Sequence, residues 1–294
     1  MSFLWFLSDL RFPAADIFFQ GVTYLAQEVL VIVFICWFFW CGNKNLAYKL
    51  GFSYFLSGLT IQGLKITFRI PRPWVLDPNF KAVESALPAA TGYSFPSGHT
   101  QSGTSFLTTL AWQTKRLGLR IACIAGFLLI GLSRMYLGVH TPKDVFTSMI
   151  VTFIIASLVC TQWKRIEHDK SKDLSIAIIL TIVAAALIIY DVILLQNGLL
   201  EEKNATDCLK ACGAGLAFGF SFYIERKYIN FKLPDNTKDK IIRFALGMIG
   251  VLIIEVGGKA ILPSAIIFAC IRYFLIVLWI LVLYPLIFTH AKKA

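Results

Sequence analysis

Long apolar runs dominate this sequence and leave it few folds to adopt. Hydrophobic residues make up 57% of the 294 residues and charged residues only 15%, against about 45–50% and about 25% in an ordinary soluble domain. A water-soluble fold of this length cannot hide so much apolar surface, so the excess requires a bilayer as a second apolar medium. The composition therefore predicts a single integral membrane domain over residues 1–294.

Helices that cross the hydrocarbon core need about 20 predominantly apolar residues. Nine runs approach or meet this length, and they predict an all-α transmembrane bundle of about nine spans. Residues 1–19 begin with an apolar stretch that is too short to span, so they are predicted to lie at the membrane interface. The nine predicted spans are residues 20–41, 46–68, 98–114, 119–137, 142–163, 173–196, 206–225, 239–258 and 263–288.

Loop charges predict how these spans are oriented. The net charge is +11, and basic residues gather in the loops after the first, third, fifth and seventh runs and in the tail after the ninth. Because lysine and arginine accumulate in cytoplasmic loops, the N-terminus is predicted to lie outside and the C-terminus in the cytoplasm. The basic residues form no face with interleaved aromatics, so nucleic acid is not expected as a partner.

Two loops on the predicted outer face break this charge rule. Residues 69–97 and 138–141 share that face, and the basic residues in them or directly after them are Arg69, Arg72, Lys81 and Lys143. Basic residues that are retained on the outer side have another function to serve. Inside the predicted spans, by contrast, Glu255 and Arg272 are expected to form a structural ion pair between the last two spans.

Three polar clusters lie at the predicted outer ends of spans two to five. The clusters are Lys65 with Arg72-Pro73, then Pro96-Ser97-Gly98-His99, then Ser133-Arg134 with His140 and Asp144. In their order and spacing they resemble the three motifs of the type 2 phosphatidic acid phosphatase superfamily, which includes membrane lipid phosphatases and the vanadium haloperoxidases. The resemblance covers about 80 residues directly.

These residue types suit phosphoryl chemistry. A phosphoryl group in transfer carries negative charge on three equatorial oxygens. Lys65, Arg72 and Arg134 supply three cations, and arginine adds a planar fork for bidentate contact. The helix that is predicted to start near His99 offers free N–H groups and a partial positive charge to an anion.

The resemblance implies a role for each residue. His140 would be the nucleophile that attacks phosphorus, and Asp144 would orient it. His99 would protonate the leaving oxygen and then activate water to release a phosphohistidine. Residues 20–165 would form the catalytic core, and residues 166–294 would add helices without an assigned role. The phosphate would be bound by Lys65, Arg72, Ser97, Gly98 and Arg134.

Each residue also has a structural interpretation. Ser97 is a preferred helix N-cap, and the segment 141–144 matches a helix start that carries a capping acid, Asp144. Lys65 and Arg72 could snorkel to the interface. These interpretations would have to hold for all the motif residues at once, and they do not explain why the residues share one face.

The segment between the first two motifs bears on the substrate. An apolar, aromatic cover over the site favours a lipid phosphate that arrives from the outer leaflet, although the same residues could simply anchor a loop at the interface. A soluble sugar phosphate is the alternative substrate, because nine spans resemble the glucose-6-phosphatase branch. A transporter would show inverted repeats, which are not evident, and a silent lipid-binding protein would be expected to lack some motif residues. The aromatic residues are Trp74, Phe80, Tyr93 and Phe95.

No metal or other cofactor is expected. The motifs hold one acid, Asp144, against three cations, whereas Mg²⁺ and Ca²⁺ need several oxygen ligands. The charge rule places the site on the outer face of a bacterial plasma membrane, or on the lumenal side in a eukaryote.

Overall fold

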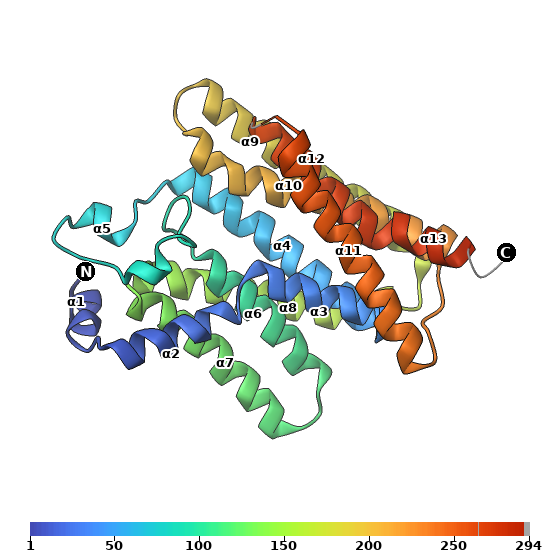
Figure 1. Cartoon of the computed structure of the whole chain (residues 1–294), viewed down its shortest axis with the longest axis horizontal. Helices are drawn as coiled ribbons and strands as arrows, with labels where there is room; N and C mark the ends of the chain where they lie inside the picture. The colour runs from blue at the N-terminus through green and yellow to red at the C-terminus, as the bar shows by residue number, and fades with distance from the viewer. Residues whose placement is uncertain (264, 291–294) are drawn as a thin grey trace. The chain divides into compact units, whose positions relative to one another are not determined.

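The computed structural model describes residues 1–263 and 265–290, and within these ranges the chain is helical and has no β-strand (Figure 1). The chain divides into two compact units. The first combines Met1–Ile32 with Phe52–Cys160, and the second combines Val33–Gly51 with Thr161–Ala294. The all-helical class predicted from the sequence is confirmed.

Within the described ranges, six helical segments are long and apolar enough to cross a membrane. The predicted spans 46–68, 98–114 and 206–225 are helical too, but they fall outside this set because they are too short or too polar for the same criterion. The six segments are Pro13–Cys41, Leu117–Tyr136, Pro142–Ile166, Lys170–Gln196, Thr237–Ile261 and Ile266–Thr289.

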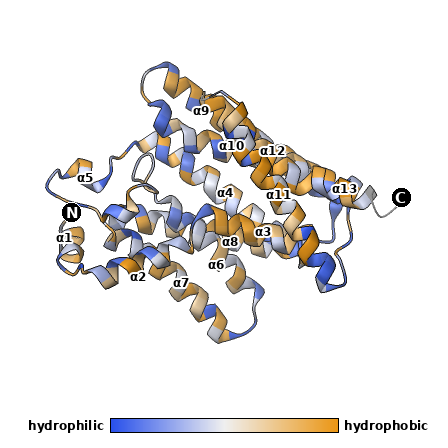
Figure 2. Ribbon diagram, in the orientation of Figure 1, coloured by the Kyte–Doolittle hydropathy of each residue, from blue (hydrophilic) through white to orange (hydrophobic). Residues whose placement is uncertain are grey.

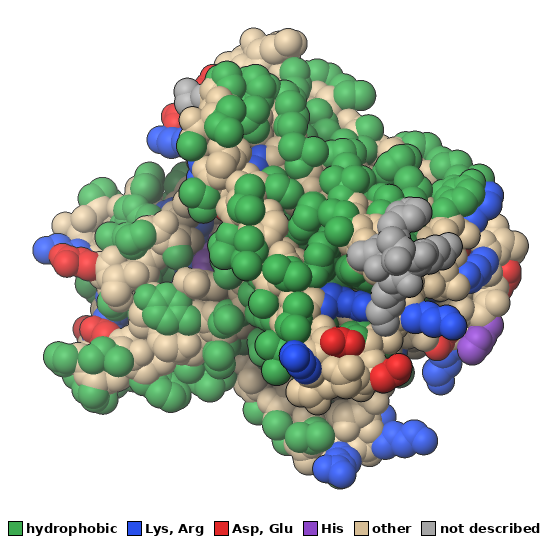
Figure 3. Space-filling model, turned by 45° about the vertical axis from the view of Figure 1, so that its right-hand side comes forward, with side chains coloured by type: hydrophobic (Ala, Val, Ile, Leu, Met, Phe, Trp, Pro, Cys, Tyr) green, Lys and Arg blue, Asp and Glu red, His purple; other side chains and the backbone are tan. Residues whose placement is uncertain are grey.

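Apolar side chains cover the outside of these helices as well as their packed sides. Ile17 exposes 75% of its surface and Ile261 exposes 83%. Figure 2 shows hydrophobic residues along most of the helices, and Figure 3 shows hydrophobic side chains over much of the visible face. Exposed apolar surface of this extent marks contact with another apolar medium. The chain is therefore a multi-pass integral membrane protein.

The first unit holds all three motifs. The first predicted span of the chain, 20–41, is not one continuous helix, because a turn at residues 25–27 separates α2 from α3. Pro13 begins α2 and Glu28 begins α3, which are residue types that favour a helix start. The elements up to the end of the third motif are α1 (Ser2–Asp9), α2 (Pro13–Tyr24), α3 (Glu28–Cys41), α4 (Lys44–Phe68), α5 (Pro73–Leu76), η1 (Glu84–Ala86), α6 (Gly98–Gln113), α7 (Leu117–Tyr136) and α8 (Pro142–Ile166).

The second unit packs its helices through small residues and ion pairs. A Cβ at Gly213 would collide with the carbonyl of Cys270, so glycine lets the two helix backbones approach closely. Arg272 Nε donates to Glu255 Oε2 at 2.9 Å, which confirms the pair predicted from the sequence. The elements are η2 (Lys170–Lys172), α9 (Asp173–Gln196), α10 (Glu202–Ile224), η3 (Glu225–Ile229), α11 (Thr237–Ile261), α12 (Ile266–Leu278), η4 (Trp279–Leu283) and α13 (Tyr284–His290).

Candidate active site

The three motifs converge at one place in the first unit. Arg72 of the first motif contacts His140 of the third, with Nη1 2.9 Å from Nε2. The backbone N–H of Ser97, in the second motif, donates to the carbonyl of Asp144 at 3.2 Å. Residues far apart in the sequence are thus brought into direct contact. The polar and charged motif side chains that are buried are Lys65, Arg72, Ser97, Ser133, Arg134, His140 and Asp144.

The second motif forms the N-terminus of α6. Ser97 Oγ accepts from the backbone N–H of Thr100 at 3.4 Å and from its hydroxyl at 2.9 Å. The interpretation of Ser97 as a helix cap is therefore confirmed. The hydroxyl hydrogen of Ser97 is not used in these two contacts, so it can still be donated to an anion. Lys65 Nζ lies 3.9 Å from where a Cβ on Gly98 would be, which places a cation at the same helix start.

The ring of His140 has its two nitrogens in different surroundings. Arg72 donates to Nε2, and because a guanidinium has no acceptor, Nε2 must carry the lone pair. Nδ1 therefore carries the hydrogen, and it faces Asp144 Oδ2 at 3.6 Å and Ser94 Oγ at 3.5 Å. The nitrogen with nucleophilic character is the one that points toward the cations.

Asp144 both caps α8 and holds the third motif in place. Its Oδ2 accepts from the backbone N–H of Thr141 at 2.7 Å, which is the capping contact expected from the sequence. The same oxygen accepts from Ser94 Oγ at 2.5 Å. Its distance to His140 Nδ1, 3.6 Å, exceeds that of a hydrogen bond. The carboxylate thus orients His140 in part through Ser94.

Ser94 is a site residue that the sequence interpretation missed. It is fully buried, and its backbone N–H donates to the carbonyl of Ile70, which ties the loop before α6 to the end of the first motif. The only sign of Ser94 in the sequence was that it is a small polar residue between Tyr93 and Phe95. A serine in that context is too common to be assigned a role without its neighbours.

Arg72 is held by backbone carbonyls. Its Nε donates to Gly92 at 3.1 Å, its Nη1 donates to Val139 at 3.0 Å, and its Nη2 donates to Thr91. Gly92 and Thr91 lie in the loop before the second motif, and Val139 lies within the third motif, directly before His140. The guanidinium therefore binds the loops together and is fixed beside His140.

Buried donors on Arg134 and His99 lack acceptors. Arg134 is fully buried, yet its Nε and Nη2 atoms have no hydrogen-bond partner among the residues that the structure describes, and neither does His99 Nε2. A buried polar group without a partner costs about 1–3 kcal/mol, and more when it is charged. Such a set of donors is suited to an anion.

The aromatic residues proposed to cover the site differ in their surroundings. Phe80 is buried against Leu4 and Leu7 of α1, and Phe95 is buried edge-on to Phe68 at 5.4 Å. Trp74 and Tyr93 are only partly buried. Only Trp74 and Tyr93 therefore retain substantial surface for a substrate.

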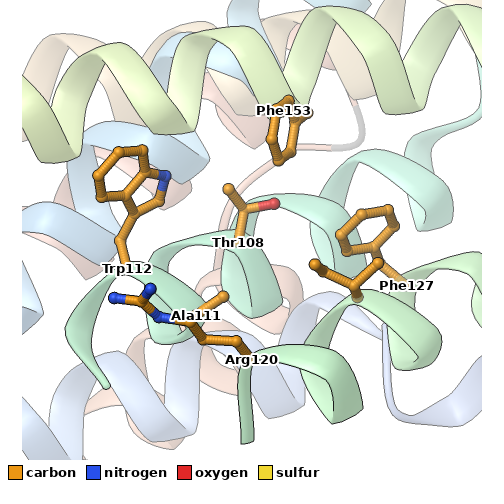
Figure 4. A pocket seen from close by; sticks show the side chains of 7 residues that line it. Thr108, Ala111, Trp112, Arg120, Phe127 and Phe153 are labelled. Atoms are coloured by element: carbon orange, nitrogen blue, oxygen red, sulfur yellow. The ribbon is translucent and has the colours of Figure 1, made fainter. Parts of the chain in front are cut away.

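A cavity of about 190 Å³ lies elsewhere in the first unit. Its lining comes from the C-terminal half of α6 and from α7 and α8, and none of the motif residues contributes to it (Figure 4). This cavity is therefore separate from the converged motifs. It is lined by Thr108, Ala111, Trp112, Arg120, Ile124, Phe127 and Phe153.

Comparison with known protein families shows which family has these motifs. Residues 46–168 match the PAP2 superfamily, and residues 209–294 match the transmembrane extension of PAP2 superfamily phosphatases. The chain belongs to the PAP2 superfamily. The resemblance drawn from the motifs is thereby confirmed, and all three motifs lie inside the first PAP2 match.

Relatives of this PAP2 chain include enzymes from animals and bacteria. Sphingosine-1-phosphate phosphatase 2 of Mus musculus is 28% identical over 209 residues, which cover 69% of this chain and 57% of the relative. Undecaprenyl-diphosphatase BcrC of Bacillus subtilis is 33% identical over 109 residues, which cover 35% and 53%. The crystal structure of Aquifex aeolicus LpxE shows 25% identity and a TM-score of 0.47 over 54% of this chain and 92% of that one. The chain spans about half the length of the curated relatives it matches.

The protonation state of His140 in this PAP2 site gives a testable prediction. Burial lowers its pKa well below the ordinary value of 6.5, and the nearby Arg72, Arg134 and Lys65 lower it further. The neutral ring should persist as the pH falls past 6.5, and it should be protonated only when the pH reaches the lowered pKa. Nitrogen-15 NMR of labelled histidine, with His140→Gln to assign the signal, should show an untitrated ring at pH values just below 6.5. A His140 signal that titrates at the ordinary value would contradict this.

Proposed function

We propose that this chain is a metal-independent membrane phosphatase, which hydrolyses a phosphate monoester or pyrophosphate of a lipid through a phosphohistidine at His140. One observation carries the proposal. The lone pair of His140 Nε2 lies in a buried group of cations, and Arg134 and His99 add donors that lack a partner in the described chain. A phosphoryl group would satisfy those donors and present phosphorus to the lone pair.

The first chemical step forms a bond between His140 Nε2 and phosphorus. The bond between phosphorus and the leaving oxygen breaks, and His99, which is protonated once the anionic phosphate is bound beside it, gives that proton to the leaving oxygen. Before this attack, Arg72 must turn its Nη1 hydrogen from His140 to a phosphate oxygen, which frees the lone pair of Nε2. Lys65 and Arg134 neutralise charge on the other oxygens.

The second step releases phosphate. His99, now without its proton, accepts one from a water molecule, and the resulting hydroxide attacks phosphorus. The bond between phosphorus and His140 Nε2 breaks, which restores the lone pair and the starting protonation states. Ser94 and Asp144 hold the ring in the same tautomer through both steps.

Charge balance supports independence from a metal ion. Three cations surround the phosphate position, and the nearby acid, Asp144, already accepts hydrogen bonds from Thr141 and Ser94. A divalent ion would gain few oxygen ligands there and would be repelled by the cations. Lys65, Arg72 and Arg134 supply the positive charge that a metal would otherwise bring.

The orientation of the chain is part of the proposal. Nine spans with an external N-terminus put the motif loops on the outer face, and basic residues on the opposite loops support this direction. The six helices that meet the length and composition criterion, together with α4, α6 and α10, would make up the nine. The substrate would then arrive from the outer leaflet, past Trp74 and Tyr93.

Relatives support a lipid substrate. Their names specify sphingosine-1-phosphate, undecaprenyl diphosphate and phosphatidylglycerophosphate, which are phosphate groups attached to apolar tails. The buried, membrane-embedded character of the helices around the site suits such a tail. A soluble sugar phosphate is the alternative, and its support is the nine-span layout alone.

A substrate panel in excess chelator tests this function. The purified protein in detergent or nanodiscs is given sphingoid-base phosphate, phosphatidate, phosphatidylglycerophosphate, polyprenyl diphosphate and glucose 6-phosphate, and phosphate release is measured. We expect release from one or more lipid phosphates, with no loss when EDTA is present. No release from any compound would refute the phosphatase proposal, and loss of activity only in EDTA would refute independence from a metal. Release from the sugar phosphate alone would select the alternative substrate.

A further inference from the structure

The N-terminal helices precede the part of the chain that matches the PAP2 superfamily, which begins at residue 46. Even so, α2 reaches the third motif. The hydroxyl of Thr23 accepts a hydrogen bond from Arg134 Nη1 at 2.9 Å, and both residues are buried. A residue outside the matched family region thus contacts one of the three phosphate-site cations.

The position of this contact on the guanidinium is informative. Arginine binds phosphate best in a bidentate manner, through two parallel N–H groups on one edge of its plane. In Arg134 the Nε and Nη2 atoms form such an edge, and these are the atoms without a partner within the described ranges. Thr23 holds the remaining nitrogen, Nη1. The contact therefore fixes the plane and leaves the bidentate edge for a phosphate.

The helix that carries Thr23 is itself firmly anchored to α7. Val22 and Ala26 pack with Ile130 in an apolar cluster on one side of Thr23. On the other side, the hydroxyl of Tyr136 donates to Asp16 Oδ1 at 3.0 Å. Thr23 is thus held at a set distance from Arg134 by contacts on both sides.

Arg11 fastens the same segment to the loops of the site. Its Nε donates to the carbonyl of Tyr136 at 2.9 Å, and its Nη1 donates to the carbonyl of Lys81 at 2.6 Å. It also lies against Gly138, whose φ of 75° favours glycine, and a Cβ there would lie 2.6 Å from Arg11 Nη2. The N-terminal segment is therefore integrated with the third motif.

From this geometry we propose that Thr23 is a positioning residue for phosphate binding: its hydroxyl fixes the plane of Arg134 so that the Nε and Nη2 edge faces the substrate. The proposal deepens the proposed function and rests on it. Thr23 does not touch the substrate, and it acts through Arg134. Residues 1–45 would then contribute to the active site as well as to the membrane anchor.

Thr23→Val tests the proposal because valine keeps the branched shape and removes the hydroxyl. We expect kcat/KM to fall roughly 10- to 100-fold, the range that corresponds to a hydrogen bond to a charged group. Inorganic phosphate, as a competitive inhibitor, should bind correspondingly more weakly. Thr23→Ser, which restores the hydroxyl, should recover most of the activity and the phosphate affinity.

Thr109→Val is the matched control. Thr109 is buried on α6, and its hydroxyl contacts Ser53 Oγ at 3.0 Å and the carbonyl of Ser105 at 2.8 Å, well away from the motifs. This variant loses a comparable hydrogen-bonded hydroxyl and should lose thermal stability without weakening phosphate inhibition. If Thr23→Val behaves in the same way, Thr23 serves packing alone and the proposal fails.

Two further measurements test the role of Thr23 independently of the phosphatase proposal. Calorimetric binding of inorganic phosphate needs no turnover, so it reports on Thr23 even if no substrate is hydrolysed. Equal activity and phosphate affinity in wild type and Thr23→Val would overturn the positioning role while leaving the phosphatase intact. Should Thr23→Val fail to accumulate, Thr23→Cys can be compared with Thr23→Ser, since the two differ in one atom. Weaker phosphate binding in the cysteine variant supports the role, and equal binding refutes it.

Discussion

Replacing His140 with alanine should reduce phosphate release by at least about 10³-fold, because the proposed covalent step loses its nucleophile. The lone pair of Nε2 has no evident substitute in the site. Ser94 donates its hydroxyl to Asp144, and Ser97 caps α6. The remaining polar groups are cations and donors, which can hold a phosphate but cannot attack it. Residual binding of phosphate by Lys65, Arg72 and Arg134 should survive the change.

The measurement pairs turnover with trapping of the intermediate. Wild-type protein that is quenched after brief exposure to phosphorus-32-labelled substrate should carry label that is stable in alkali and lost in acid, as a phosphohistidine is. His140→Ala should carry none. His168→Ala is the matched control, because His168 is exposed and lies outside the motifs, so it should label and turn over as wild type does. Label that is retained in His140→Ala would assign the nucleophile elsewhere.

The helices of this fold were predictable because their signals are local. A run of about 20 apolar residues spans a bilayer whatever its neighbours are, and each of the nine predicted runs is helical over most of its described residues. The break at residues 25–27 was not predicted. Gln27 and Glu28 are the polar residues at this turn, but apolar residues surround them on both sides, so hydropathy averaged over a span does not separate α2 from α3. The contacts of α2 with α7 show where the first helix ends, because they hold α2 beside the third motif while α3 continues separately.

The motif residues were predictable for a different reason, namely that phosphoryl chemistry restricts the residue types and that their spacing resembles one superfamily. The residues that support them lack such a signature. Thr23 and Arg134 are 111 positions apart, and Ser94 acquires its role only from Asp144, 50 positions away. A threonine and a serine in apolar surroundings usually bond to their own helix. Contacts of this kind become visible only when the chain is folded.

Phe80 shows that a position between two motifs does not by itself predict a role at the site. Its position between the first two motifs suggested a role in substrate access, and its aromatic ring suited a lipid. In the structure its ring packs edge-on to Trp5 at 5.2 Å and beneath Arg11 at 5.3 Å. Sequence position placed it near the site, but the packing partner came from the N-terminal helix.

His99→Gln should separate the two histidine roles because its effect depends on the leaving group. With a lipid phosphate, whose alkoxide needs a proton to depart, turnover should fall about 10²- to 10⁴-fold, the usual contribution of a general acid. With an aryl phosphate whose phenolate departs without a proton, attack by His140 should proceed far faster than with the lipid. Release of the phosphohistidine also needs His99, as base, so the labelled intermediate should accumulate. A nucleophile and an acid therefore give opposite results: His140→Ala carries no label, whereas His99→Gln carries more than wild type.

The aryl substrate also shows which step limits His99→Gln. A burst of phenolate equal to the amount of protein, followed by slow turnover, is expected if attack is intact and hydrolysis is impaired. His99 Nε2, which has no hydrogen-bond partner in the described part of the chain and lies close enough to Arg134 to feel its charge, is where such a proton would be exchanged. If aryl and lipid phosphates lose equal activity and no label accumulates, His99 does not transfer the proton, and its buried ring serves only to bind phosphate. His168→Gln should leave both substrates unaffected, since His168 lies outside the group of motif residues.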